Sequence, residues 1–175
     1  MIDRGDEFPG SDLPTGVTFL KADGTRVTLQ SMVGSKTLVL FFYPKDHTSG
    51  CTAEACEFRD QYEDFVKAGA EVIGISADDA SSHESFKGKY RLPYTLLTDP
   101  DGAASRAFDI KKTFGLIKGR VTFVIDRAGK VRHRFESQVK VRQHVSEALD
   151  VVRRLEAEAA ASARSPAPSA APRPA

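Results

Sequence analysis

This 175-residue sequence has only two cysteines, no tryptophan and nearly balanced charge. What it lacks excludes several classes of protein. No stretch approaches the roughly 18 apolar residues that a helix needs to cross a bilayer. The first ten residues, MIDRGDEFPG, lack the apolar core of a secretory signal peptide. The net charge of +1 gives no electrostatic case for binding nucleic acid or a membrane surface. We therefore expect a cytoplasmic protein that binds neither.

Only two cysteines are present, Cys51 and Cys56. In a reducing compartment such a pair is more often catalytic, redox-sensing or metal-binding than a structural disulfide. Zinc would need two further ligands at a compatible spacing, and three of the four histidines (His83, His133 and His144) lie far along the chain. The C-x-x-C spacing of dithiol oxidoreductases is also missing. We therefore rank a metal site low, and we place a thiol–disulfide oxidoreductase last among the redox functions.

Hydrophobic periodicity predicts a regular succession of strands and helices. Residues 16–29 alternate around a central Asp-Gly pair, which indicates an N-terminal β-hairpin. Apolar runs and helical spacing indicate the following elements: strands at 36–43, 71–76 and 94–99, helices from about 50 to 69 and at 81–92, 101–110 and 142–158, and a second hairpin from 120–126 and 130–136. This order predicts an α/β fold with a central mixed sheet flanked by helices.

The domain organisation follows from the composition. Residues 1–157 are predicted to form one domain, because they carry all the periodic segments. Residues 158–175 are rich in Ala, Pro and Ser and have nothing to bury, so they are predicted to be a disordered tail.

The chemistry of the sequence is concentrated in its cysteines. Cys51 lies where a strand has ended and a helix begins, and the partial positive charge of a helix N-terminus stabilises a thiolate. Cys56 lies inside the same helix, where the alternative interpretation is an ordinary core position. Two residues five apart on an ideal helix have Cα atoms about 8–9 Å apart, and a disulfide tolerates about 7 Å at most. Either the thiols never pair, or the helix unwinds to let them.

The stretch FFYPKDHTSGCTAEACEFRD carries a family resemblance. Pro44, Thr48 and Cys51 stand at the positions of the P-x-x-x-T-x-x-C signature, and the sequence resembles the peroxiredoxins, thiol peroxidases with a thioredoxin-like fold. The second cysteine five residues later and the later GRVTFVID are similar to the bacterioferritin-comigratory, or Q-type, subgroup. The resemblance covers roughly residues 5–155 and excludes the tail.

The resemblance implies a thioredoxin-dependent peroxidase that serves antioxidant defence. Cys51 would be the peroxidatic cysteine, whose thiolate attacks a hydroperoxide and becomes a sulfenic acid. Cys56 would be the resolving cysteine, which forms an intramolecular disulfide that thioredoxin then reduces. No metal, haem or flavin is implied, because sulfur itself carries the redox change. A resolving thiol in the same chain makes a monomer the expected state.

Five other residues receive roles only through the resemblance. Thr48 would offer its hydroxyl to the thiolate and the peroxide, and Arg120 would place a guanidinium beside the thiolate. Glu54 would orient Arg120 by an ion pair, while Pro44 and Tyr43 would shape the substrate pocket. Taken singly, each has a plainer interpretation: a turn or cap residue, a surface charge, a first-turn acid, a strand terminator and a core aromatic.

One departure concerns Ser49, because the subgroup usually has proline there, and the loop is therefore expected to be less rigid. A second function also remains open at this point. The protein could be a peroxide-responsive sensor or holdase in which unwinding of the helix exposes a surface for a partner. Residues 158–175 are the sequence feature that would favour it.

Overall fold

The computed structural model describes residues 11–112 and 117–164 and contains one mixed eight-stranded sheet in the order β1-β8-β7-β4-β5-β6-β2-β3. The strands are β1 (Ser11–Asp12), β2 (Thr18–Leu20), β3 (Arg26–Thr28), β4 (Thr37–Phe42), β5 (Ala70–Ser76), β6 (Thr95–Thr98), β7 (Val121–Ile125) and β8 (Lys130–Glu136). The helices are α1 (Leu29–Met32), α2 (Ser49–Lys67), α3 (Ala80–Tyr90), the 3-10 turn η1 (Pro100–Gly102), α4 (Ala103–Ala107) and α5 (Val141–Arg164). The predicted α/β class is confirmed.

The predicted elements are present with adjusted ends. Both hairpins form, from β2 with β3 and from β7 with β8, and both are antiparallel. The helix predicted over 101–110 is shorter, because a left-handed Gly102 separates η1 from α4 and α4 ends at Ala107. Periodicity missed β1 and α1, which have two and four residues and are too short to show a period.

The sheet is buried on both faces, as the continuous apolar run of β4 predicts. Val39 and Phe41 belong to a core shared with α2, α3 and α5, whereas Leu38, Leu40 and Phe42 belong to a second core shared with α1 and α4. Successive strand residues point to opposite faces, so one strand supplies both cores. All six residues of β4 are buried.

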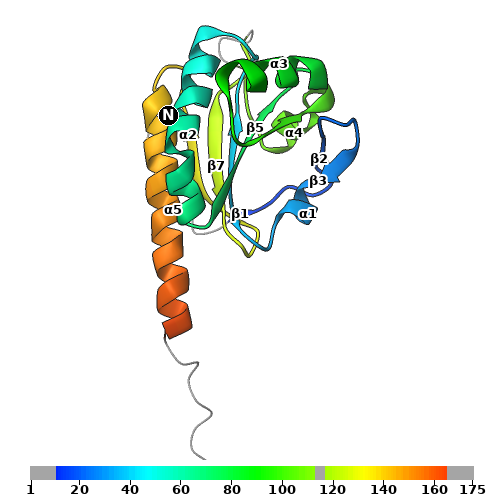
Figure 1. Cartoon of the computed structure of the whole chain (residues 1–175). Helices are drawn as coiled ribbons and strands as arrows, with labels where there is room; N and C mark the ends of the chain where they lie inside the picture. The colour runs from blue at the N-terminus through cyan, green and yellow to red at the C-terminus, as the bar shows by residue number, and fades with distance from the viewer. Residues whose placement is uncertain (1–10, 113–116, 165–175) are drawn as a thin grey trace, which may run out of the picture.

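Helices α2 and α5 lie side by side along one face of the sheet (Figure 1). Phe58 and Phe65 of α2 and Val145 and Val152 of α5 belong to the same buried core. Val66 is 48% exposed, because one further residue along the helix turns its side chain away from the core. The buried stripe of α2 therefore ends at Phe65.

The C-terminal helix is longer than the sequence predicted. Helix α5 continues to Arg164, so residues 158–164, predicted to begin the disordered tail, are helical. Alanine and glutamate have high helix propensity, and this run contains both. The rest of the predicted tail, residues 165–175, lies outside the described residues, and a domain boundary at 157 stays a prediction.

Within the described ranges, no helix is both long enough and apolar enough to span a membrane.

Candidate active site around Cys51

Cys51 is held in the first turn of α2, directly behind the loop that leaves β4. It is the third residue of the helix and is 1% exposed. Thr48 is the N-cap residue, with extended backbone. The first N–H groups of a helix have no intrahelical acceptor and carry partial positive charge, which favours an anion at this position. The sequence prediction that Cys51 opens a helix is confirmed.

The nearest charge to Cys51 comes from the opposite strand. Arg120 directly precedes β7, and antiparallel pairing sets Val121 opposite Phe42, the last residue of β4. The Arg120 Nη2 donates to Cys51 Sγ at 3.3 Å, and its Nε donates to the Gln138 carbonyl at 3.2 Å. Arg120 is 4% exposed, so its charge is weakly screened. The predicted juxtaposition of Arg120 and Cys51 is present.

Glu54 lies one turn after Cys51 on α2, and the Arg120 guanidinium contacts both residues. Its Oε1 accepts from Arg120 Nη1 at 2.8 Å, and the residue is 0% exposed. This is the expected ion pair. Burial nevertheless raises the pKa of Glu54 to about 7, because removal from water outweighs the attraction and hydrogen bond from Arg120.

Thr48 and Pro44 lie in the loop between β4 and α2. The Thr48 hydroxyl donates to the Lys45 carbonyl at 2.8 Å, so its single proton is engaged by that carbonyl. Its oxygen keeps lone pairs that can accept a hydrogen bond. Pro44 is half-buried where β4 has ended. Their roles toward peroxide stay predictions.

Tyr43 belongs to a buried polar network at the other end of the same loop. Its hydroxyl donates to Asp46 at 2.5 Å and lies 3.4 Å from His83 Nδ1, while Asp46 also accepts from Ser82. Its ring packs on Phe41 with centroids 5.5 Å apart. Its hydroxyl is therefore used to fix the loop, and a role in the substrate pocket stays a prediction.

The Asp46–His83 network also contains the one cluster of possible metal ligands among the described residues, Asp46, Asp78 and His83, whose ligand atoms lie within 4.8 Å of one another. Asp46 accepts from His83 Nδ1 at 2.7 Å, and Asp78 accepts from Ser76 and from the Asp46 backbone, each at 2.7 Å. These hydrogen bonds give the carboxylate and imidazole atoms of the cluster partners within the protein, so none of these atoms needs a cation as its partner. Neither cysteine belongs to this cluster.

Cys56 lies on α2 with a free thiol, half-buried and five residues from Cys51. Both cysteines are inside a regular helix, so the Cα separation of about 8–9 Å applies and a disulfide cannot form without local unwinding. The adjacent Ala55 carbonyl accepts from the Tyr94 hydroxyl at 2.6 Å, which anchors this part of α2 to the segment before β6.

Three residues at the site were not identified from the sequence. A Cβ atom built on Gly50 would lie 2.9 Å from Arg120 Nη2, so glycine leaves room for the guanidinium. His144 and Thr122 stand behind Glu54, with His144 Nδ1 at 3.6 Å from Glu54 Oε2 and 2.8 Å from Thr122 Oγ1. Gly50 could have been noticed in the sequence, because glycine is unfavourable inside a helix and its presence in the first turn is therefore unusual. Nothing local marked Thr122 or His144.

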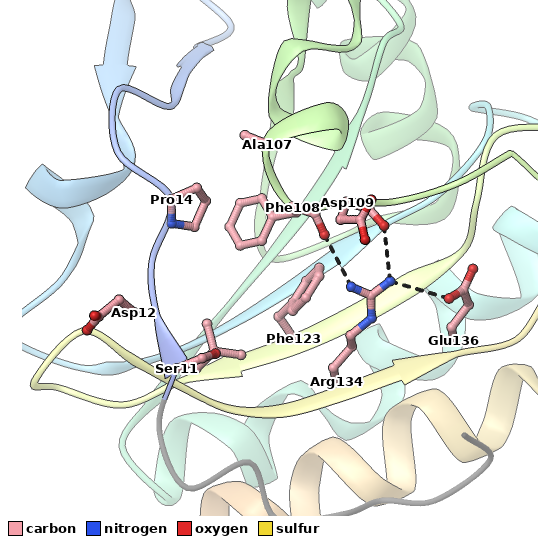
Figure 2. Close-up of a pocket in the computed structure, with 10 residues that line it drawn as sticks. Ser11, Asp12, Pro14, Ala107, Phe108, Asp109, Phe123, Arg134 and Glu136 are labelled. Carbon is pink, nitrogen blue, oxygen red and sulfur yellow. Dashed lines mark hydrogen bonds and ion pairs between the residues drawn. The ribbon is translucent and has the colours of Figure 1, made fainter. Parts of the chain in front are cut away.

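A separate pocket of about 500 Å³ lies on the other side of the sheet (Figure 2). Phe108 and Phe123 line it, and Arg134 lies over the Phe123 ring at 5.4 Å. The Arg134 guanidinium donates to the Phe108 and Asp109 carbonyls and to Glu136, so both of its terminal nitrogens are already engaged (Figure 2). None of the predicted site residues lines this pocket.

Comparison with known proteins places the chain in a family. It matches the model of the AhpC/TSA family over residues 5–134. Chloroplastic peroxiredoxin Q of Suaeda salsa is 46% identical over 144 residues, which are 82% of this chain and 67% of the relative. The same protein of Triticum aestivum is 44% identical over 144 residues, 82% of this chain and 66% of the relative. The chain thus spans about two thirds of these relatives.

Comparison with solved structures gives the same family. Bacterioferritin comigratory protein of Xanthomonas campestris superimposes with a TM-score of 0.73 at 33% identity, covering 82% of this chain and 94% of that one. Peroxidoxin BcpB of Mycobacterium tuberculosis gives 0.71 at 32% identity, covering 88% and 98%. This likeness confirms the predicted thioredoxin-like fold. The chain therefore belongs to the AhpC/TSA family and, within it, to the peroxiredoxins of the Q, or bacterioferritin-comigratory, type.

Proposed function

We propose that this protein is a thiol peroxidase that reduces hydrogen peroxide and organic hydroperoxides with electrons from thioredoxin. The observation that carries the proposal is the buried Arg120 guanidinium at 3.3 Å from Cys51 Sγ, at the N-terminus of α2. The helix end and the guanidinium both favour the thiolate over the thiol. A thiolate held ready in this way is the nucleophile that peroxide chemistry requires.

The first step is attack of the Cys51 thiolate on the terminal oxygen of ROOH. A sulfur–oxygen bond forms, the oxygen–oxygen bond breaks, and the leaving oxygen takes up a proton to give ROH. Arg120 donates hydrogen bonds to the oxygens as negative charge moves onto them. Because the Thr48 hydroxyl donates to Lys45, its oxygen would accept a hydrogen bond from the peroxide rather than donate to the thiolate.

The second step closes the disulfide. After the first turns of α2 unwind, the Cys56 thiolate attacks the sulfur of the Cys51 sulfenic acid, a sulfur–sulfur bond forms, the sulfur–oxygen bond breaks, and the hydroxide that leaves takes up the proton released by Cys56 to give water. A dithiol reductant then restores both thiols by exchange, and thioredoxin is the proposed reductant. Since both cysteines belong to one chain, turnover needs no second subunit, and we propose a monomer.

The peroxide class and the cellular location extend beyond the family assignment. The Xanthomonas relative is described by its alkyl peroxide reduction activity, which supports organic hydroperoxides as substrates here. The plant relatives are chloroplastic proteins. A cytoplasmic location for this chain stays a prediction. The sensor alternative relied on residues 158–175, most of which lie outside the described residues, so we do not propose it.

Intact mass spectrometry after one equivalent of peroxide tests the scheme. We expect a loss of about two mass units, which maps to a bond between Cys51 and Cys56 and is reversed by thioredoxin. Cys56→Ser should stop at the Cys51 sulfenic acid and lose thioredoxin-coupled turnover, while Cys51→Ser should not react. Retention of both thiols after peroxide, or full activity in Cys51→Ser, would refute the proposal.

A further inference from the structure

The buried site contains one cation and two acidic groups that compete for it. Arg120 contacts Cys51 Sγ through Nη2 at 3.3 Å and Glu54 Oε1 through Nη1 at 2.8 Å. Cys51 is 1% exposed and Glu54 is 0% exposed, so water screens neither contact well. If both acids were ionised, the cluster would carry a net buried negative charge. It is neutral when one of the two retains its proton.

The hydrogen-bond pattern identifies where that proton fits. Glu54 Oε1 is used by Arg120, whereas Oε2 is buried and accepts no hydrogen bond from any described residue. An ionised carboxylate oxygen without a donor is costly in the interior. A proton on Oε2 removes the buried charge, which costs far more than a neutral polar group without a partner, so Oε2 is the atom at which a proton lowers the cost of burial.

The unprotonated nitrogen of His144 faces that oxygen. Its Nε2 lies 2.7 Å from the Ser137 carbonyl, which only accepts, so Nε2 carries the ring proton. The Nδ1 of the neutral ring therefore has a lone pair, which accepts from the Thr122 hydroxyl at 2.8 Å and lies 3.6 Å from Glu54 Oε2. An ionised Oε2 would face this electron-rich nitrogen at 3.6 Å, and protonation of Oε2 removes that repulsion.

The pKa values of the titratable groups around Glu54 are consistent with a proton on Glu54. Burial lowers the pKa of His144 to about 4, with further lowering by the charges of Arg120 and His133, so the ring stays neutral. Burial raises the pKa of Tyr94 well above its usual range, so its hydroxyl stays neutral as well. Burial raises the pKa of Glu54 to about 7, despite Arg120. Cys51 is then the one remaining acid that faces Arg120.

We propose that Glu54 holds a proton on Oε2 while Cys51 is a thiolate, and that His144 is the positioning residue that keeps Oε2 in this state. Cys51 loses one proton and Glu54 gains one, so the buried cluster keeps its net charge. The full charge of Arg120 is then left to the thiolate. This deepens the proposed function and rests on it, since it assigns Cys51 as the reactive anion.

Infrared spectroscopy of the reduced protein without peroxide tests the proposal independently of any peroxidase activity. At neutral pH we expect a carbonyl band of a protonated carboxylic acid that disappears in Glu54→Gln. In Cys51→Ser the competing anion is gone, so Glu54 ionises against Arg120 and the band is lost there too. Glu147→Gln is the matched control: Glu147 Oε2 is also buried and unbonded and lies 3.7 Å from His133 Nε2, and this variant keeps the band.

Each outcome decides a part of the proposal. Identical spectra for the native protein and Glu54→Gln would overturn it, because Glu54 would be ionised. A band that persists in Cys51→Ser would overturn the link between the proton and the thiolate. His144→Gln can keep a donor to the Ser137 carbonyl but removes the Nδ1 acceptor. We expect its acid band to move in frequency and to titrate away at lower pH, and an unmoved band would remove His144 from the proposal.

Discussion

The hydroxyl of Tyr94 is hydrogen-bonded to the segment of α2 that must unwind before the two cysteines can form a disulfide. It is buried, and it donates to the Ala55 carbonyl at 2.6 Å, between Cys51 and Cys56 in the sequence. Tyr94→Phe removes this bond and keeps the ring, which packs edge-on against Phe41 at 5.7 Å. The substitution therefore destabilises the closed helix with little change in the surrounding core.

The size of the effect follows from the net value of one hydrogen bond. A typical intramolecular bond contributes about 1 kcal/mol to stability, with a range of about 0.5–1.5 kcal/mol. If the bond is broken before the sulfurs meet, disulfide formation should accelerate about fivefold, and by about twofold to twelvefold over that range. Oxidation of Cys51 by peroxide precedes unwinding and should keep its rate.

Quenched-flow mixing with thiol trapping and mass spectrometry separates the two steps, and it suits a chain without tryptophan. The matched control is Tyr62→Phe, which removes a hydrogen bond from the Tyr62 hydroxyl to Glu71 at 3.0 Å on the part of α2 beyond Cys56. Its disulfide formation should keep the native rate. Unchanged or slower disulfide formation in Tyr94→Phe would refute the idea that α2 opens at Ala55.

Three further predictions concern the helix start and acid stability. Gly50→Ala would place a Cβ 2.9 Å from Arg120 Nη2, so peroxide should oxidise Cys51 on the order of tenfold to a hundredfold more slowly in stopped-flow assays, with no loss of thermal stability. Ser49→Pro puts proline at the first position of α2, where it stabilises a helix by about 0.4–1 kcal/mol, so quenched flow should record disulfide formation about twofold to fivefold slower. Burial lowers the pKa of His133 from 6.5 to about 4, so the free energy of unfolding should fall by up to roughly 3 kcal/mol as pH drops through that window, and His133→Gln should flatten this dependence in urea titrations.

The sign of the His133 effect is fixed by linkage. Below pH 6.5 the unfolded chain binds a proton on this histidine and the folded chain does not, so acid favours unfolding until the folded form also titrates near pH 4. An equal pH dependence in His133→Gln would contradict it. Native oxidation rates in Gly50→Ala would show that Arg120 does not need its present position. Native disulfide formation in Ser49→Pro would show that the first turn of α2 does not limit resolution.

Local sequence determined most helices and strands and pointed to Cys51 as the proposed nucleophile. The apolar run Leu38–Phe42 of β4 and the spacing of Phe58 and Phe65 on α2 involve only a few neighbouring residues, so periodicity identifies them. The position of Cys51 at a helix start, and its spacing to Cys56, also follow from the chain alone. Short elements such as β1 and α1, and the end of α5, were less predictable, because few residues define them.

Only the tertiary structure decided what surrounds the thiol. Arg120 lies 69 residues from Cys51 and meets it because β7 pairs with β4 in a register that sets Val121 opposite Phe42. His144 reaches the back of Glu54 because α5 packs beside α2 over the same face of the sheet. Strand order and helix packing bring these groups together, and no pattern of neighbouring residues encodes them. The sequence by itself thus identified the thiol that we propose as the reactive group, and the fold decided which charged groups surround it.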